Sequence, residues 1–274
     1  MMLGIDVDAE VYKALSARRS SESESMNDVL RAWLNLGTAT ESSQILNQSK
    51  IPPTFANSHP RHVPQAGGAV ARIAVLGSTG KIGDKIVDEA IRRGIAVTAI
   101  ARDPSKLGPR EGMEARAGDA NDPGSLVEAC KGADALVVAV KWLGIDPGKL
   151  LEAVRNSGVK RAIFVVGTGT SLREDGRRQF IHAAEAAGVP APTSVPAMRV
   201  LDALVGSTGF DWTAITCPQE IASGERTATF RVGDARMIVD EHGTSRISEQ
   251  DFAVAIIDEL EEPHNIGSQF CVAY

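Results

Sequence analysis

Three glycines whose spacing predicts a phosphate-binding loop are Gly77, Gly80 and Gly83. They follow the apolar, β-branched run 72–76 and precede a segment with the apolar spacing of a helix. In a strand–loop–helix unit the first glycine permits a tight turn, the second lets the backbone approach a pyrophosphate, and the third lets the helix pack on the strand. The loop therefore predicts a dinucleotide site. The N–H groups predicted to point at the phosphates belong to Thr79, Lys81 and Ile82.

Two cations stand where the second predicted strand ends. Many NAD-binding domains place an acidic residue at this point to bind the ribose hydroxyls. This sequence has Arg102 instead, and Lys106 adds a positive charge four residues later. A guanidinium can stack on adenine and pair with a 2′-phosphate, so the pair predicts NADP(H) as the cofactor. The alternative is that both side chains only face solvent.

Acidic residues flank the next predicted turn. Asp119 and the adjacent Ala120 follow the third predicted strand, where Asp119 is placed to meet the amino group of adenine. Asp103 and Asp122 are predicted to be turn and helix-cap residues, because short side-chain carboxylates accept hydrogen bonds from nearby backbone N–H groups.

The elements that must position these residues alternate along the chain. Short, nearly continuous apolar runs at 72–76, 96–100, 135–140 and 161–166 are typical of parallel strands covered on both faces. Helical stretches between them end in Gly94, Gly132 and Gly158. This alternation predicts an α/β fold for residues 71–274, with a doubly wound, Rossmann-type parallel sheet.

The same region resembles a known family. The motifs that carry the resemblance are Arg102-Asp-Pro-Ser-Lys-Leu107, Gly118-Asp119, Gly209-Phe-Asp-Trp-Thr213, Gly224-Glu-Arg-Thr227 and Ser245-Arg-Ile-Ser-Glu-Gln-Asp-Phe-Ala-Val-Ala255. They resemble the atypical short-chain dehydrogenases that include NmrA-like proteins, NADH-flavin reductases and biliverdin reductase B. The nicotinamide contacts implied by the resemblance are Val140, Lys141, Thr168, Gly169, Pro218 and Ile221.

The proton donor of classical short-chain dehydrogenases is missing. Their Tyr-x-x-x-Lys pair has no counterpart, because the two tyrosines, Tyr12 and Tyr274, are not followed by such a lysine. We therefore expect a reductase that transfers hydride to a conjugated small molecule, such as a flavin, quinone or enone, which spreads the added charge. Thr168 and Glu220 are the candidate catalytic side chains, although the pattern around Glu220 favours a surface loop residue over a catalytic acid. The alternatives are an NADP(H)-binding redox sensor without turnover and a scaffold whose nucleotide is structural.

The N-terminal third predicts a separate module. Residues 1–37 read as a strand and two helices, and residues 38–70, rich in Ser, Thr, Asn, Gln, Pro and Gly, read as a linker. The first segment resembles the ribbon-helix-helix fold, as in the N-terminal oligomerisation domain of SeqA. It is too short to bury its own apolar residues, so we expect a homo-oligomer formed through residues 1–37. Nucleic-acid binding is disfavoured, because the outer face of the predicted strand offers Met2, Gly4 and Asp6.

Composition narrows the remaining classes. The chain has 274 residues, a formal net charge of −6 and three cysteines without metal-ligand spacing. The negative charge predicts a small-molecule partner rather than a polyanion. The number and spacing of the cysteines suggest neither a disulfide framework nor a metal site. No segment reads as a secretory signal or a membrane span, so we expect a cytoplasmic protein that does not bind membranes.

Overall fold

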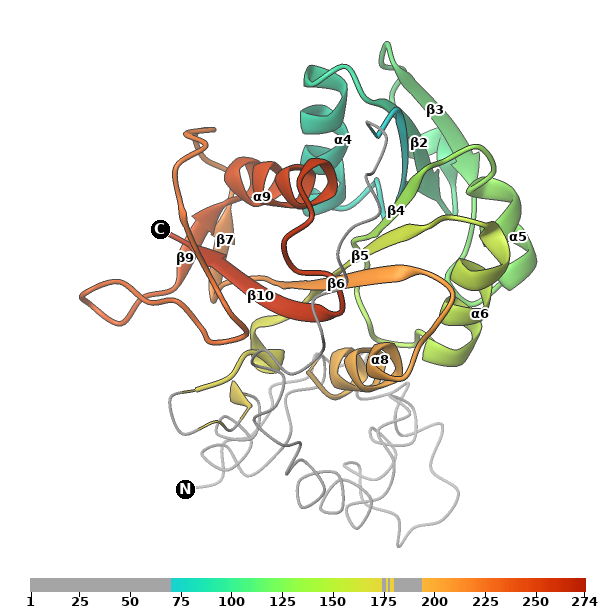
Figure 1. Cartoon of the computed structure of the whole chain (residues 1–274). Helices are drawn as coiled ribbons and strands as arrows, with labels where there is room; N and C mark the ends of the chain where they lie inside the picture. Colours follow the sequence, from blue (N-terminus) through green and yellow to red (C-terminus); the bar gives the residue numbers. More distant parts are fainter. Residues whose placement is uncertain (1–69, 174–175, 177, 180–193) are drawn as a thin grey trace, which may run out of the picture.

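A computed structural model describes residues 70–173, 176, 178–179 and 194–274 of the chain. These residues contain one large sheet with helices on both faces (Figure 1). The predicted module at residues 1–37 and nearly all of the predicted linker lie outside the described residues. Their predicted structure therefore stays a prediction.

The large sheet has eight strands, and seven of them run in parallel. In spatial order they are β3 (Met113–Ala117), β2 (Ala96–Ala101), β1 (Arg72–Leu76), β4 (Ala135–Val138), β5 (Arg161–Val166), β6 (Asp211–Thr216), β10 (Ser268–Ala273) and β8 (Arg231–Gly233). Only the edge strand β8 is antiparallel to its neighbour, β10. The chain order reverses at β1, which has β2 on one side and β4 on the other. The predicted doubly wound α/β fold is confirmed.

The pairing register aligns the carboxyl ends of the central strands β1, β2 and β4. Leu76, the last residue of β1, pairs with Ile100 of β2 and Val138 of β4. The loops that follow these three strands therefore leave the same edge of the sheet. In doubly wound sheets, ligands bind in the crevice at this carboxyl edge, beside the strand where the order reverses.

Helices cover the two faces in separate groups (Figure 1). The helices α4 (Lys81–Arg92) and α9 (Glu249–Glu261) cover one face, and α5 (Pro123–Ala129), α6 (Pro147–Ser157) and α8 (Ser194–Val205) cover the other. Strand β1 is almost wholly apolar because both of its faces are buried. Its Ile73 and Val75 pack into the core under α4 and α9, whereas Ala74 and Leu76 pack into the opposite core.

Local sequence signals set the helix boundaries. Asp122 caps α5 by accepting a hydrogen bond from Ser125 N at 3.2 Å, and Asp103 caps the 3₁₀ turn η2 (Pro104–Lys106) through Ser105 N at 3.2 Å. Both predicted cap roles are confirmed. Gly158 ends α6 with a φ of 80°, a left-handed conformation that glycine adopts without steric cost.

The C-terminal part contains elements that were not predicted. Strands β7 (Glu220–Ala222) and β9 (Arg246–Ser248) form a second, two-stranded sheet. Beside it, the fully buried carboxylate of Asp251 accepts hydrogen bonds from Thr227 Oγ1 at 2.6 Å, Ala228 N at 2.7 Å and Tyr274 Oη at 2.8 Å. These bonds hold Ala228 at a φ of 54°, which is unusual for a residue with a side chain.

None of the helices within the described residues has the length and apolar character needed to cross a membrane.

Candidate functional site

A cleft of about 680 Å³ opens at the carboxyl edge of β1, β2 and β4. Its walls come from the loops after these strands and after β3. The residues that line it are Leu76, Gly77, Thr79, Gly80, Ala101, Arg102, Gly118, Asp119, Ala120, Asn121, Ala139, Val140, Lys141, Leu143, Gly144 and Ile145. The structure thus gathers eight of the predicted cofactor residues around one hollow. They are Gly77, Thr79, Gly80, Arg102, Asp119, Ala120, Val140 and Lys141.

The three glycines of the loop meet different geometric needs. Gly77 has a φ of 94°, and a Cβ there would overlap the backbone of Ala139. A Cβ on Gly83 would overlap the carbonyl group of Gly77, so this glycine allows the helix to pack against the loop. A Cβ on Gly80 would meet only Gly77 O, at 3.2 Å, and would otherwise enter open space. The first and third glycines therefore serve the fold, and the second keeps the cleft clear.

The first turn of α4 is suited to an anion. Its N-cap residue, Gly80, has no side chain to accept the first N–H groups. These groups and the helix dipole favour a phosphate at this end of the helix. Of the other predicted residues here, Lys81 is exposed and Ile82 is half-buried against the core under α4 and α9. The site fits a dinucleotide pyrophosphate.

The two predicted cations have different surroundings. Arg102 is exposed and lines the cleft. Lys106 is 71% exposed, lies outside the cleft lining and pairs with Asp103 at 3.7 Å. Of the two, Arg102 is placed to meet the adenosine half of a nucleotide.

A polar part of the cleft lining comes from the loop between β3 and α5. Asp119 Oδ1 accepts a hydrogen bond from Asn121 N at 2.8 Å, and Ser125 Oγ accepts one from Asp119 N at 3.1 Å. These bonds fix the carboxylate at the cleft. Asn121, Leu143, Gly144 and Ile145 also line it, and the sequence reading missed all four. The signal that could have located this loop is Asp146-Pro147. An Asp cap followed by Pro at the first helical position marks the start of a helix, and therefore the end of the loop before it.

The other predicted nicotinamide residues lie outside the cleft lining. Thr168 and Gly169 follow β5, Pro218 follows β6, and Ile221 lies on β7. Thr168 Oγ1 lies 2.8 Å from the carbonyl oxygens of both Cys217 and Pro218. Thr168 thus joins the two loops. Around it, Gly169 and Ile221 are half-buried and Pro218 is buried.

Glu220, the second candidate catalytic residue, lies on β7 and is exposed. It lines a different hollow of about 260 Å³, together with Arg246 and Tyr274. None of these three residues lines the cleft. Tyr274 is engaged elsewhere, since its hydroxyl donates to Asp251 and accepts from Ser248 N at 3.2 Å.

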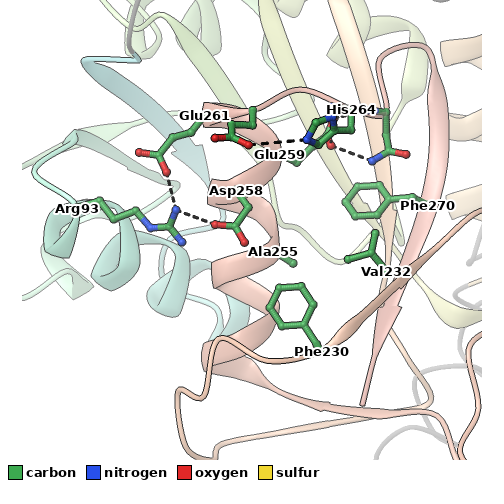
Figure 2. A pocket seen from close by; sticks show the side chains of 11 residues that line it. Arg93, Phe230, Val232, Ala255, Asp258, Glu259, Glu261, His264 and Phe270 are labelled. Atoms are coloured by element: carbon green, nitrogen blue, oxygen red, sulfur yellow. Dashed lines mark hydrogen bonds and ion pairs between the residues drawn. The ribbon is translucent and has the colours of Figure 1, made fainter.

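A third hollow, of about 450 Å³, shares no residue with the cleft. Figure 2 shows Phe230, Val232 and Phe270 on one side of it and Arg93 on the other. Arg93 pairs with Asp258 at 2.8 Å and Glu261 at 2.5 Å, so these charges tie α4 to α9.

Two buried cysteines in the described part of the chain are poorly suited to nucleophilic chemistry. Burial raises the pKa of Cys130 and of Cys271 to about 12, so both thiols are protonated and poorly nucleophilic at neutral pH. Within the same residues, no three His, Cys, Asp or Glu side chains are grouped to hold a metal ion.

Comparisons with known proteins agree with this site. Residues 77–263 match the model of a family described as NAD(P)H-binding. YwnB of Bacillus subtilis is 28% identical over 211 residues, which cover 73% of this chain and 97% of YwnB. An isoflavone reductase homolog of Zea mays is 28% identical over 142 residues, 44% of this chain and 46% of the plant protein.

Solved structures show the same fold. A Bacteroides thetaiotaomicron protein assigned as an epimerase is 30% identical, with a TM-score of 0.68 over 75% of this chain and 97% of its own. A Burkholderia pseudomallei protein assigned as exported is 34% identical, with a TM-score of 0.66 over 74% of this chain and 100% of its own.

Proposed function

The chain belongs to the NAD(P)H-binding family and is an oxidoreductase, and from that premise we propose that it is an NADPH-dependent reductase of conjugated small molecules. The observation that supports this most is the cleft itself. It combines a glycine loop that a dinucleotide can approach with Arg102, a cation where a 2′-phosphate would lie. The isoflavone reductase homolog adds support for reduction of a conjugated ring system.

The residues of the chain supply binding and orientation in this proposal. NADPH, when bound, supplies the hydride. The loop at Gly77–Gly83 and the start of α4 hold its phosphates, Arg102 and Asp119 hold its adenosine half, and Val140 and Lys141 lie toward its nicotinamide. Thr168 supports the loop after β6 instead of acting on the acceptor, because its hydroxyl faces two backbone carbonyls. Such a site accelerates reduction by placing donor and acceptor at reacting distance, and solvent delivers the proton.

Purified full-length protein is expected to oxidise NADPH when a flavin, a quinone or an enone is added. The reaction is followed by the loss of NADPH absorbance under anaerobic conditions, with each acceptor varied separately. Tight binding of NADP(H) with no oxidation across this panel would contradict the reductase. That result would favour the alternative, a redox sensor that binds NADP(H) without turnover.

Substitutions at Thr168 and Glu220 test the absence of a dedicated proton donor. Thr168→Val and Glu220→Gln are each expected to lower kcat by less than about tenfold, because a positioned general acid is typically worth about 10²–10⁴-fold. The measurement is kcat with a quinone acceptor, after calorimetry has shown unchanged NADPH affinity. A loss of about 10²-fold or more at either residue would assign it a catalytic role.

We also propose that residues 1–37 form a homo-oligomer and that the protein works in the cytoplasm. Ile5 lies on the predicted inner face of the N-terminal strand, and Asp6 lies on its outer face. Ile5→Asp is therefore expected to lower the subunit number measured by light scattering, whereas the control Asp6→Asn is not. An unchanged subunit number in Ile5→Asp would remove the oligomerisation role. The exported assignment of the Burkholderia protein makes cell fractionation the corresponding test of location.

A further inference from the structure

Asn121 joins two loops that form one end of the cleft. It lies between β3 and α5, and its side-chain Nδ2 donates to Gly144 O at 2.7 Å. Its Oδ1 accepts from Asp146 N at 2.8 Å. Both polar groups of the carboxamide are therefore used across the loops, while the backbone N–H of Asn121 holds Asp119 Oδ1.

The loop that Asn121 binds is held at three points along the chain. It runs from β4 to α6, and its Leu143 is 41% exposed. One residue before Leu143 it is anchored by Trp142, whose buried indole Nε1 donates to Val165 O at 2.9 Å. At its end, Asp146 caps α6 by accepting from Gly148 N at 2.8 Å. Between the described residues of the two loops, no hydrogen bond other than those of Asn121 is present.

In the loop after β4, the residues that Asn121 ties follow the anchored Trp142, whereas the predicted nicotinamide residues Val140 and Lys141 precede it. Asp119, Ala120 and Asn121 line the cleft from one loop, and Leu143, Gly144 and Ile145 line it from the other. Arg102 lies on the same cleft. The cleft thus combines the Asp119 carboxylate, the apolar side chains of Leu143 and Ile145 and the Arg102 guanidinium, which together suit the polar edge and the apolar faces of a purine ring.

We propose that Asn121 is a positioning residue for the adenosine half of the cofactor: it fixes the width of the adenine slot by tying the loop after β3 to the loop after β4. The inference rests on the proposed NADPH site. It adds that affinity for the adenosine half depends on a side chain that need not touch the nucleotide. Because the Asn121 bonds are half-exposed, their loss opens the slot without unfolding the sheet.

Calorimetry of the full-length protein with 2′,5′-ADP and with NADPH tests this. Asn121→Ala is expected to raise the Kd of 2′,5′-ADP by roughly tenfold, the scale of one or two ordinary hydrogen bonds. The Kd of NADPH is expected to rise by the same factor, because the Trp142 anchor separates the part of the loop that Asn121 holds from Val140 and Lys141. Asn121→Asp keeps the acceptor for Asp146 N but places a carboxylate oxygen against Gly144 O, so it is expected to raise the Kd at least as much as Asn121→Ala. The matched control is Asn156→Ala, an exposed asparagine on α6.

The outcomes separate this inference from the proposed function. An unchanged Kd for 2′,5′-ADP in Asn121→Ala would overturn it. A markedly larger loss for NADPH than for 2′,5′-ADP would also overturn it, because a general loosening would then reach the nicotinamide half. If Asn121→Ala does not fold, Asn121→Asp carries the same comparison. If the wild-type protein does not bind 2′,5′-ADP, the proposed preference for NADPH is wrong. The Kd of 5′-ADP is then compared between the wild type and the same variants. No step requires an acceptor or turnover.

Discussion

Gly80→Val is expected to abolish NADPH binding while leaving the domain folded. The structure gives Gly80 ordinary backbone angles, with φ of −82° and ψ of 160°, which valine can adopt. Its side chain would project into open space at the mouth of the cleft, where the pyrophosphate must approach the backbone. Loss of two or more hydrogen bonds to a charged phosphate, each worth about 1.5–3 kcal/mol, raises the Kd by more than about 100-fold.

The neighbouring glycines provide the contrast that makes this result specific. Gly77→Ala and Gly83→Ala are expected to lower the free energy of unfolding, because their Cβ atoms would overlap backbone that cannot move aside. Overpacking of this kind typically costs about 1–3 kcal/mol, and the φ of 94° at Gly77 adds backbone strain. Urea denaturation measures this loss, and calorimetry measures the Kd of NADPH. Gly108→Val, at a glycine with no atom within 4 Å of its Cβ position, is the control.

Two results would contradict this division of roles. If Gly80→Val binds NADPH within tenfold of wild type, the phosphates do not lie on this loop. If Gly80→Val instead unfolds at much lower urea than wild type, Gly80 serves the fold and the space above it is not a ligand site.

The central strands could be predicted because a strand buried on both faces has a continuous run of apolar residues in the sequence. Residues 72–76 and 161–166 are apolar on both faces, and they form β1 and β5 with the predicted bounds. Glycine spacing likewise located the loop at Gly77, because its turn and its close approaches are local. The strand predicted at 135–140 ends at Val138, since Ala139 and Val140 already belong to the loop that lines the cleft.

Features that depend on distant parts of the chain were not predictable in this way. Asn121 and Gly144 are 23 residues apart, and they meet only because β3 and β4 end at the same edge of the sheet. The edge strand β8 is only three residues long, so its antiparallel pairing with β10 left little periodicity to detect. Thr168 and Glu220 could be named from the resemblance. The sequence did not reveal that Thr168 joins two loops or that Glu220 lines a separate hollow.

The proposed preference for NADPH is expected to depend on Arg102 and not on Lys106. Arg102→Ala is expected to weaken NADPH binding by about 1.5–3 kcal/mol, the range for hydrogen bonds to charged groups, which corresponds to roughly 10- to 150-fold in Kd. NADH, which lacks the 2′-phosphate, is expected to lose far less. Lys106→Ala is the matched control, because its ammonium lies outside the cleft lining and is already paired with Asp103.

Salt provides an independent readout of the same contact. A pairing between Arg102 and a 2′-phosphate at an exposed position is screened by ions, so the NADPH advantage over NADH is expected to shrink as ionic strength rises toward 1 M, where the screening length is about 3 Å. Arg102→Ala is expected to remove most of this salt dependence, and Lys106→Ala to retain it. Equal losses of NADPH and NADH affinity in Arg102→Ala would show that the guanidinium serves adenine stacking alone, and that the 2′-phosphate is not recognised at this position.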